Sequence, residues 1–155
     1  MGLVAQFGSD YIGNKVSDFQ KRLEAAGVFM LKYLGEDLAK YAKDNHNYTD
    51  QTGNLTNSIG YAVVRNKEII YCDATNQPGE GSDAMLKAAL KVVDGLTETL
   101  SLIIVAGMNY AAYVEAKGYN VILPAELKAK KDFPIAMAKL VEKARKRALL
   151  EFGII

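Results

Sequence analysis

Apolar residues recur every three or four positions between residues 17 and 44, which is the spacing of one helical face. The members of this face are Phe19, Leu23, Ala26, Met30, Leu34, Leu38 and Tyr41. Ser17 and Gln20 stand at the spacing of a capping box, so we expect this long amphipathic helix to begin at Ser17. Gly27 and Gly35 each cost up to roughly 1 kcal/mol relative to alanine inside a helix, so either a neighbour packs closely there or the helix is softened.

The period changes further along the chain. Residues 61–65 and 68–73 are rich in β-branched and aromatic side chains, which favour strands. Asn66 and Lys67 separate the two runs. The pattern therefore predicts a β-hairpin with a tight turn.

Residues 75–81 contain one proline and two glycines and predict an exposed loop. Such a loop buries little, so we expect it to be mobile in the isolated subunit and to contribute to assembly. A second helix is expected to begin at Ser82 and to stop at Gly95. Its apolar side would consist of Met85, Leu86, Ala89, Leu90 and Val93.

Residues 97–105 alternate between apolar and polar at first and then become apolar on both faces, which predicts a central strand. Leu100, Leu102 and Ile104 share one face of this strand. We expect that face to be buried against the first and last helices.

The last part of the chain predicts a helical turn or two over residues 110–116 and a short strand over residues 119–123. Pro134 is expected to open a final helix. The apolar stripe of that helix is Met137, Leu140, Val141, Ala144, Ala148 and Phe152. Residues 1–155 thus form one α+β domain, with a small, mainly antiparallel sheet packed against a long N-terminal helix and a C-terminal helix.

Composition narrows the classes of function. Nineteen basic and eighteen acidic residues give a formal charge of +1, which disfavours nucleic acid as the main partner. The longest apolar run, residues 102–106, is too short to cross a bilayer, and the amino terminus does not resemble a signal peptide. We therefore expect a soluble protein that is made in the cytoplasm. One cysteine, Cys72, and one histidine, His46, leave disulfide and zinc stabilisation without enough partners.

Three patterns could carry chemistry. Gly79, Gly81 and Ala84 match G-x-G-x-x-A before a helix, which would suit a small-molecule or nucleotide-binding module around residues 78–84, although nearby acidic residues oppose a pyrophosphate. His46, with Asp44 and Asp50, could serve a nuclease or hydrolase, but a histidine at a helix exit is more often simply solvated. The basic final helix could meet an acidic surface, although such a run is usually a solvated face.

Two stretches carry a resemblance to a known family. The first is T-G-N-L-T-N-S-I at residues 52–59, which predicts a short capped turn before a strand. The second is V-A-G-M-N-Y-A-A-Y-V-E at residues 105–115, with Gly118 shortly after. In this order, between a long first helix and a final helix, they resemble the tail-completion, or head-tail joining, proteins of long-tailed bacteriophages. The family pattern has a glycine two residues after the glutamate, whereas here an extra residue separates them.

The resemblance implies a virion structural protein that forms a ring with its own copies and contacts other neck or tail proteins, with no enzymatic activity, cofactor, metal or small-molecule substrate. Thr52, Gly53, Leu55, Ser58, Ile59 and Gly118 would be the structural motif residues. Tyrosines suit protein interfaces because they give contact area with a polar tip. The hypothetical subunit interface therefore comprises Tyr110, Tyr113 and Glu115 on one side and Lys139, Lys143 and Lys146 on the other.

Overall fold

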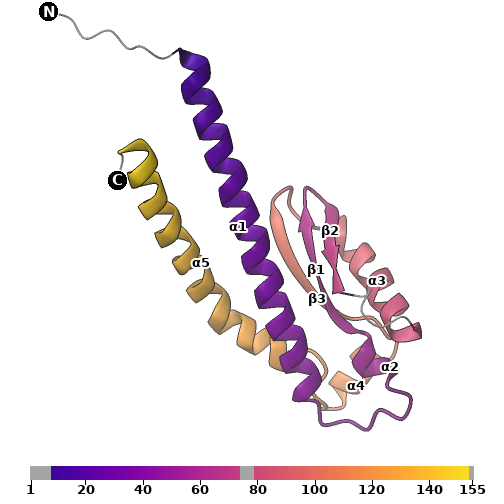
Figure 1. Ribbon diagram of the computed structural model, residues 1–155. Helices are drawn as coiled ribbons and strands as arrows, with labels where there is room; N and C mark the ends of the chain where they lie inside the picture. The colour runs from indigo at the N-terminus through magenta and orange to yellow at the C-terminus, as the bar shows by residue number, and fades with distance from the viewer. Residues whose placement is uncertain (1–7, 74–78, 154–155) are drawn as a thin grey trace, which may run out of the picture.

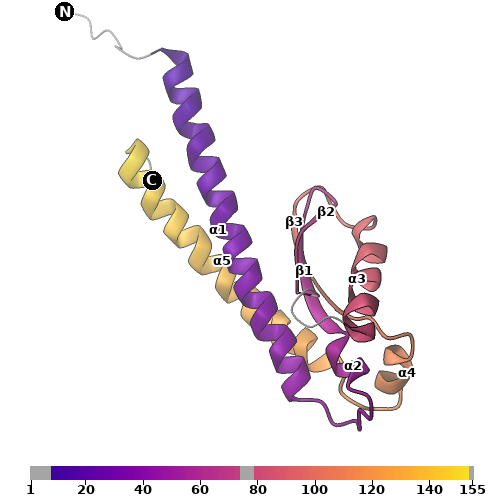
Figure 2. The same ribbon diagram turned by 45° about the vertical axis from the view of Figure 1, so that its right-hand side comes forward.

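Three layers make up the fold, with a three-stranded antiparallel sheet between one pair of long helices and one shorter helix (Figure 1). The computed structural model describes residues 8–73 and 79–153. In chain order the elements are α1 (Ser9–Asp44), α2 (Asn54–Asn57), β1 (Ile59–Arg65), β2 (Glu68–Cys72), α3 (Glu80–Val93), β3 (Leu100–Ala106), α4 (Ala111–Ala116) and α5 (Leu123–Phe152). Figure 2 shows α1 and α5 on one side of the sheet and α3 on the other, with α4 beyond the end of the sheet. The predicted α+β class with a small antiparallel sheet is confirmed.

Helix α1 begins at Ser9, so the prediction that it starts at a capping box on Ser17 is wrong. Ile12 and Val16 continue the three-to-four spacing upstream of Phe19, and this periodicity extends the helix. The buried residues of α1 all lie from Gly27 onward. The first half of α1 consequently projects beyond the sheet and forms an arm with the end of α5 (Figure 1).

Contacts between α1 and α5 hold this arm together at its tip. The guanidinium of Arg22 donates two hydrogen bonds, of 2.7 and 2.6 Å, to the two carboxylate oxygens of Glu151. Beside this pair, the rings of Phe19 and Phe152 meet edge to face with centroids 5.5 Å apart. Bidentate charge-assisted pairs fix geometry as well as adding energy, so the carboxyl end of α5 is held at a fixed position along α1.

Both glycines inside α1 lie where the sheet approaches most closely. A Cβ atom on Gly27 would come within 3.3 Å of Leu100 Cδ1, and one on Gly35 would overlap the ring of Tyr61. Of the two explanations offered by the sequence, close packing is the one that the structure supports. The predicted hairpin is also confirmed, and its turn residues Asn66 and Lys67 have φ values of 50° and 63°. Positive φ at both central residues is the requirement of a tight hairpin turn whose twist matches the strands.

Strand β1 is the centre of the sheet, and the expectation that residues 97–105 form a central strand is wrong. The strand order is β2-β1-β3, so β3 pairs with β1 along one side only. Ala62, Val63 and Val64 in β1 are fully buried. Leu100, Leu102 and Ile104 are only half-buried, because α5 does not lie flat on this part of β3.

Helix α3 begins at Glu80 and not at Ser82. Met85, Ala89 and Val93 face the sheet as predicted, whereas Leu86 and Leu90 are 39% and 55% exposed. The apolar side of α3 is therefore wider than the sheet can cover. Residues 75–78 of the predicted loop lie outside the described residues, and Glu80 and Gly81 belong to the helix.

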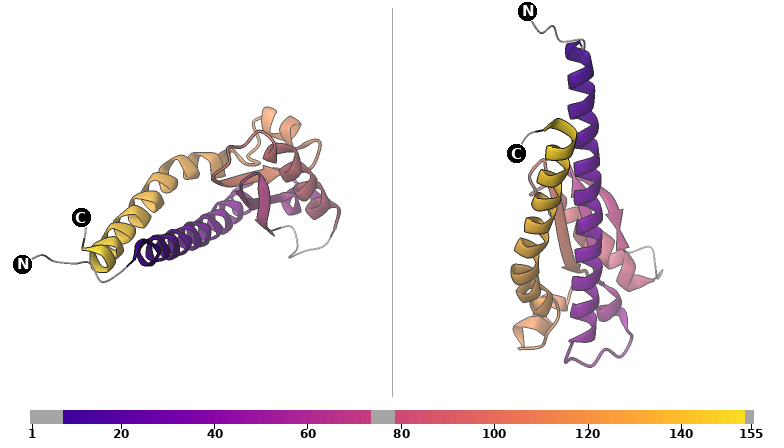
Figure 3. Two further views of the ribbon diagram at one scale, coloured as in Figure 1. Left: turned by 90° about the horizontal axis from the view of Figure 1, so that it is seen from above. Right: turned by 60° about the vertical axis from the view of Figure 1, so that its left-hand side comes forward.

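Helix α5 starts at Leu123, so Pro134 does not open it and the strand expected over residues 119–123 does not form. Pro124 occupies the first turn, where the missing N–H costs nothing. Pro134 lies in the helix interior, where a proline removes a backbone hydrogen bond and bends the helix. Seen from above, α5 bows away from α1 between its two ends (Figure 3).

Candidate functional site

The two sequence motifs meet through Ser58, which is fully buried between them. Its hydroxyl donates to the carbonyl of Leu55 (2.7 Å) and accepts from the backbone N–H of Met108 (3.3 Å). The carbonyl of Ser58 accepts from the N–H of Gly107 (3.0 Å). Fifty residues of sequence separate these partners, so the serine ties the turn before β1 to the chain leaving β3.

The first motif shapes that turn. Gly53 adopts a left-handed conformation (φ 74°) directly before α2, which suits a residue without a side chain. The hydroxyl of Thr52 accepts from the N–H of Asn54 (3.3 Å). Leu55 and Ile59 are 3% and 1% exposed and share one cluster with Ala111 and Val121. Their side chains thus pack the turn against the sheet.

A carboxylate upstream of the motif completes the turn. Asp50 Oδ2 accepts a hydrogen bond from the backbone N–H of Thr56 (2.7 Å). Partial burial acts to raise the pKa of Asp50, but hydrogen bonds from the backbone and hydroxyl of Thr56 and from the N–H groups of Leu55 and Gly53 outweigh it, so the pKa lies below its ordinary value of 3.8. The charged form of Asp50 therefore stabilises α2.

The second motif positions α4 and α5. Gly107 passes so close to α3 that a Cβ atom would lie 2.2 Å from the carbonyl of Ala84. Glu115 Oε1 accepts from the N–H groups of Ile122 (3.1 Å) and Leu123 (2.6 Å), so this side chain caps the start of α5. Gly118 ends α4 with φ 89°. No local pattern indicates this cap, because the acceptor lies seven residues away in another element.

Tyr110 and Tyr113 lie at the start and middle of α4, 38% and 64% exposed, and Tyr119 beside them is 45% exposed. Lys117 lies over the ring of Tyr113, with its Nζ 5.2 Å from the centroid. These exposed tyrosines, called the tyrosine patch below, lie in and directly beside α4, at the end of the molecule away from the arm (Figure 1). Glu115 is half-buried in its capping role, so it is not a free carboxylate beside the tyrosines as the interface hypothesis assumed.

Lys139, Lys143 and Lys146 are exposed along the carboxyl half of α5. Lys146 pairs with Glu142 at 2.9 Å. Since α4 lies near the beginning of α5, the lysines and the tyrosine patch are at different ends of the molecule (Figure 1). A contact between the two sets consequently requires two copies of the chain.

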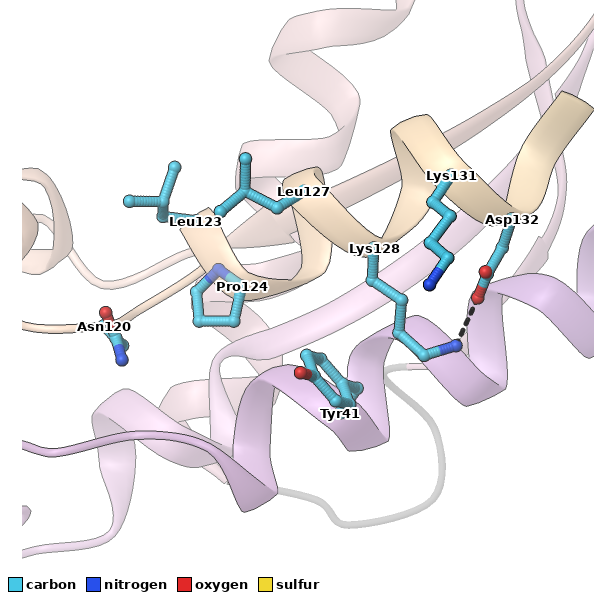
Figure 4. A pocket seen from close by; sticks show the side chains of 8 residues that line it. All are labelled: Tyr41, Asn120, Leu123, Pro124, Leu127, Lys128, Lys131 and Asp132. Atoms are coloured by element: carbon cyan, nitrogen blue, oxygen red, sulfur yellow. Dashed lines mark hydrogen bonds and ion pairs between the residues drawn. The ribbon is translucent and has the colours of Figure 1, made fainter.

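A pocket of about 560 Å³ lies where the end of α1 meets the first turns of α5 (Figure 4). Tyr41, Leu123, Pro124 and Leu127 supply apolar walls. Lys128 bonds to both Asp132 and Asp37, and these bonds raise the pKa of its ammonium. The second ammonium at the pocket belongs to Lys131. The ammonium of Lys128 is already paired with two carboxylates. The apolar walls therefore suit the apolar side chain of a partner.

A larger groove, of about 1350 Å³, runs between α1, α5 and β3. Leu23 and Met30 from α1 and Phe133, Met137 and Leu140 from α5 are among its apolar lining residues. Leu23 and Phe133 are 37% and 41% exposed. Exposed apolar surface of this kind marks interaction sites in soluble proteins.

The glycine-rich pattern before α3 has a packing explanation. A Cβ atom on Gly81 would lie 2.6 Å from the carbonyl oxygen of Asn54, so this glycine allows α2 and α3 to touch. The side-chain amide of Asn54 also donates to Glu80 (3.0 Å). The amino end of α3 is thus covered by α2 and carries a carboxylate, which is unfavourable for a pyrophosphate.

His46 stacks on Tyr48, with ring centroids 4.5 Å apart, and its Nδ1 lies 3.2 Å from the carbonyl of Tyr48. Asp50 is engaged with Thr56, so the structure does not assemble an acid–base pair from these two residues. Within residues 8–73 and 79–153, no group of three or more histidine, cysteine or acidic residues is placed to hold a metal ion. No helix in the same part of the chain has the length and apolar character needed to span a bilayer.

No protein-family model, no curated protein and no solved structure matches this chain.

Proposed function

We propose that this chain is a non-enzymatic structural protein of a long-tailed bacteriophage or prophage. It is made in the host cytoplasm, is incorporated in the virion, and assembles as a ring at the head-tail junction or the upper end of the tail. Its partners are copies of itself and other neck or tail proteins.

The observation that carries this proposal is the joining of the two motifs into one structural unit at Ser58. The residues that resemble the tail-completion family do not line a cleft with reactive groups. They fix a turn, a close helix contact and a helix cap. A family resemblance built on such residues supports a shared scaffold, and the tyrosine patch, pocket and groove around it supply surfaces for assembly.

A ring needs a heterologous contact, in which one patch meets a different patch on the next copy. The tyrosine patch belongs to the end of the molecule that carries α4, and the basic carboxyl half of α5 lies in the arm at the other end (Figure 1). Two such surfaces at opposite ends allow each copy to contact two neighbours. The engaged state of Glu115 assigns attraction in this contact to the aromatic rings and not to that carboxylate.

The proposal is tested on genes and on particles. Genes for portal, capsid and tail-tube proteins should flank this gene, and a metabolic operon around it would contradict the proposal. In particles, Tyr110→Ala with Tyr113→Ala should leave the subunit folded but yield heads and tails that fail to join. Tyr33→Ala, at a 74% exposed position on α1, is the control, and normal infectious yields from both variants would remove the tyrosine patch from the assembly surface.

A further inference from the structure

The groove between α1, α5 and β3 is larger than a site for a small ligand. Pockets for small molecules usually enclose about 300–1,000 Å³, whereas this groove encloses about 1350 Å³. It is bounded by two helices and by one edge of a sheet. Glu98, Thr99, Leu100, Ser101 and Leu102 all line it in succession. Because side chains alternate between faces along a strand, a run of consecutive residues means that the free edge of β3 also borders the groove.

The α5 wall of the groove carries apolar residues between two basic ones. Phe133, Met137 and Leu140 recur along α5 at helical spacing, and Lys130 and Arg145 line the groove on either side of them. Lys130 also pairs with Glu126 at 2.8 Å. Lys130 and Arg145 are fifteen residues apart, about 22 Å along a helix that rises 1.5 Å per residue. An amphipathic helix with an apolar stripe and acidic ends fits such a groove.

The same chain carries a helix of that description on its other side. Leu86 and Leu90 lie one turn apart on the outer face of α3, 39% and 55% exposed. Asp83 stands one turn before Leu86, and Asp94 one turn after Leu90, and both are exposed. The two aspartates are eleven residues apart, about 16 Å along the helix, which long lysine and arginine side chains at the groove ends can reach.

Net charge agrees with this pairing. Helix α5 has eight basic and four acidic residues, whereas α3 has two of each and is followed directly by Asp94. Four charges have the sign opposite to this pairing. Lys87 and Lys91 lie on α3 beside Leu86 and Leu90, which we call the α3 stripe, and Glu24 and Glu98 line the groove. Complementary potentials favour one orientation of approach over others.

We propose that the groove receives the outer face of α3 from a second copy of this chain, with Leu86 and Leu90 inserted between α1 and α5. Because α3 and the groove lie on opposite sides of the sheet (Figure 2), the contact is heterologous and repeats from copy to copy. The inference rests on the proposed ring and names the surfaces that join its subunits.

Cross-linking between copies tests the contact. In a Cys72→Ser background, Leu90→Cys places a thiol on the α3 stripe and Met137→Cys places one in the groove. The two single variants are mixed at about 1 mM, because weak contacts need millimolar concentrations, and treated with a short bis-maleimide. Leu150→Cys, at a 77% exposed position on the tip of α5, replaces Met137→Cys in the control mixture. Unchanged thermal melting of each variant establishes that it is folded.

The mixture of Leu90→Cys and Met137→Cys should give on the order of tenfold more cross-linked dimer than the control mixture, as a specific heterologous contact requires. A single chain with both cysteines should give a ladder of higher oligomers. Equal yields in the two mixtures, no dimer in either, or preferential linkage of Met137→Cys to itself would overturn the proposal. If the protein forms a ladder but its gene lies outside a phage gene cluster, the contact is retained and the proposed function is rejected. If the gene lies among phage genes but no ladder forms, the proposed function is retained and the contact is rejected.

Discussion

The ring of Tyr61 occupies the space that a side chain on Gly35 would need, since a Cβ atom there would lie 2.3 Å from Cδ2 of the tyrosine. The hydroxyl of Tyr61 donates to Glu36 at 3.2 Å, so the ring is held from both ends. This contact sets how closely α1 lies on the central strand. The glycine that this contact requires lowers the helix propensity of α1, because alanine is a better helix former than glycine.

Gly35→Ala should therefore lower the free energy of unfolding by about 1–3 kcal/mol, the usual cost of overpacking a filled core. Gly13→Ala is the matched control, because it lies in the same helix with nothing within 4 Å of its added Cβ. That variant should be more stable than the wild type by about 0.5–1 kcal/mol. Urea midpoints measure both, and equal gains from the two substitutions would show that Tyr61 does not press on Gly35.

Glu115→Ala should destabilise the protein by about 1–2 kcal/mol, because it leaves the first N–H groups of α5 without their acceptor. Glu126→Ala, in the exposed first turn of the same helix, should change stability by no more than about 0.5 kcal/mol. Thermal melting compares the two. Equal effects would mean that the cap contributes nothing beyond the charge of a carboxylate near the helix start.

Stability should fall in acid through Asp50. The folded pKa of Asp50 lies below its ordinary value of 3.8, so the unfolded chain binds the proton more tightly than the folded one. The contribution of Asp50 is therefore fully present above the unfolded pKa and is lost as the pH falls through the folded pKa. Asp50→Asn should flatten the decline in urea midpoint between pH 6 and pH 3. A decline as steep as that of the wild type would assign the acid sensitivity to other carboxylates.

Pro134→Ala should raise the free energy of unfolding by up to about 3 kcal/mol, because it removes the proline penalty from the interior of α5. A straighter α5 would narrow the groove, so the same variant should cross-link less to the α3 stripe. Pro124→Ala, in the first turn of α5, should leave both properties nearly unchanged. Higher stability with unaltered cross-linking would show that the bend of α5 does not set the width of the groove.

Local patterns predicted the elements whose determinants are local. The hairpin around Asn66 and Lys67 follows from strand composition, and the structure confirms it. The start of α5 was misplaced because Pro134 and Pro124 are both compatible with a helix start, and the choice depends on the distant carboxylate of Glu115.

Properties set by tertiary arrangement escaped sequence reasoning. Leu86 and Leu90 share the apolar side of α3 with buried residues, and only the width of the sheet decides that they remain exposed. Leu100, Leu102 and Ile104 also have the sequence pattern of core residues, yet the bow of α5 leaves them half-buried. The outer face of α3 and the β3 wall of the groove are thus made of residues whose pattern alone indicates a core.

The arm has a consequence for the timing of assembly during synthesis. Arg22 and Glu151 are separated by 129 residues, and closing so long a loop carries an entropic cost that nearby contacts do not share. One wall of the groove is α5, so a nascent chain that has emerged only as far as β3 can display the α3 stripe but has no complete groove to receive one. Neighbouring ribosomes can therefore expose many donors before any acceptor exists, which delays polymerisation until α5 has been made and docked.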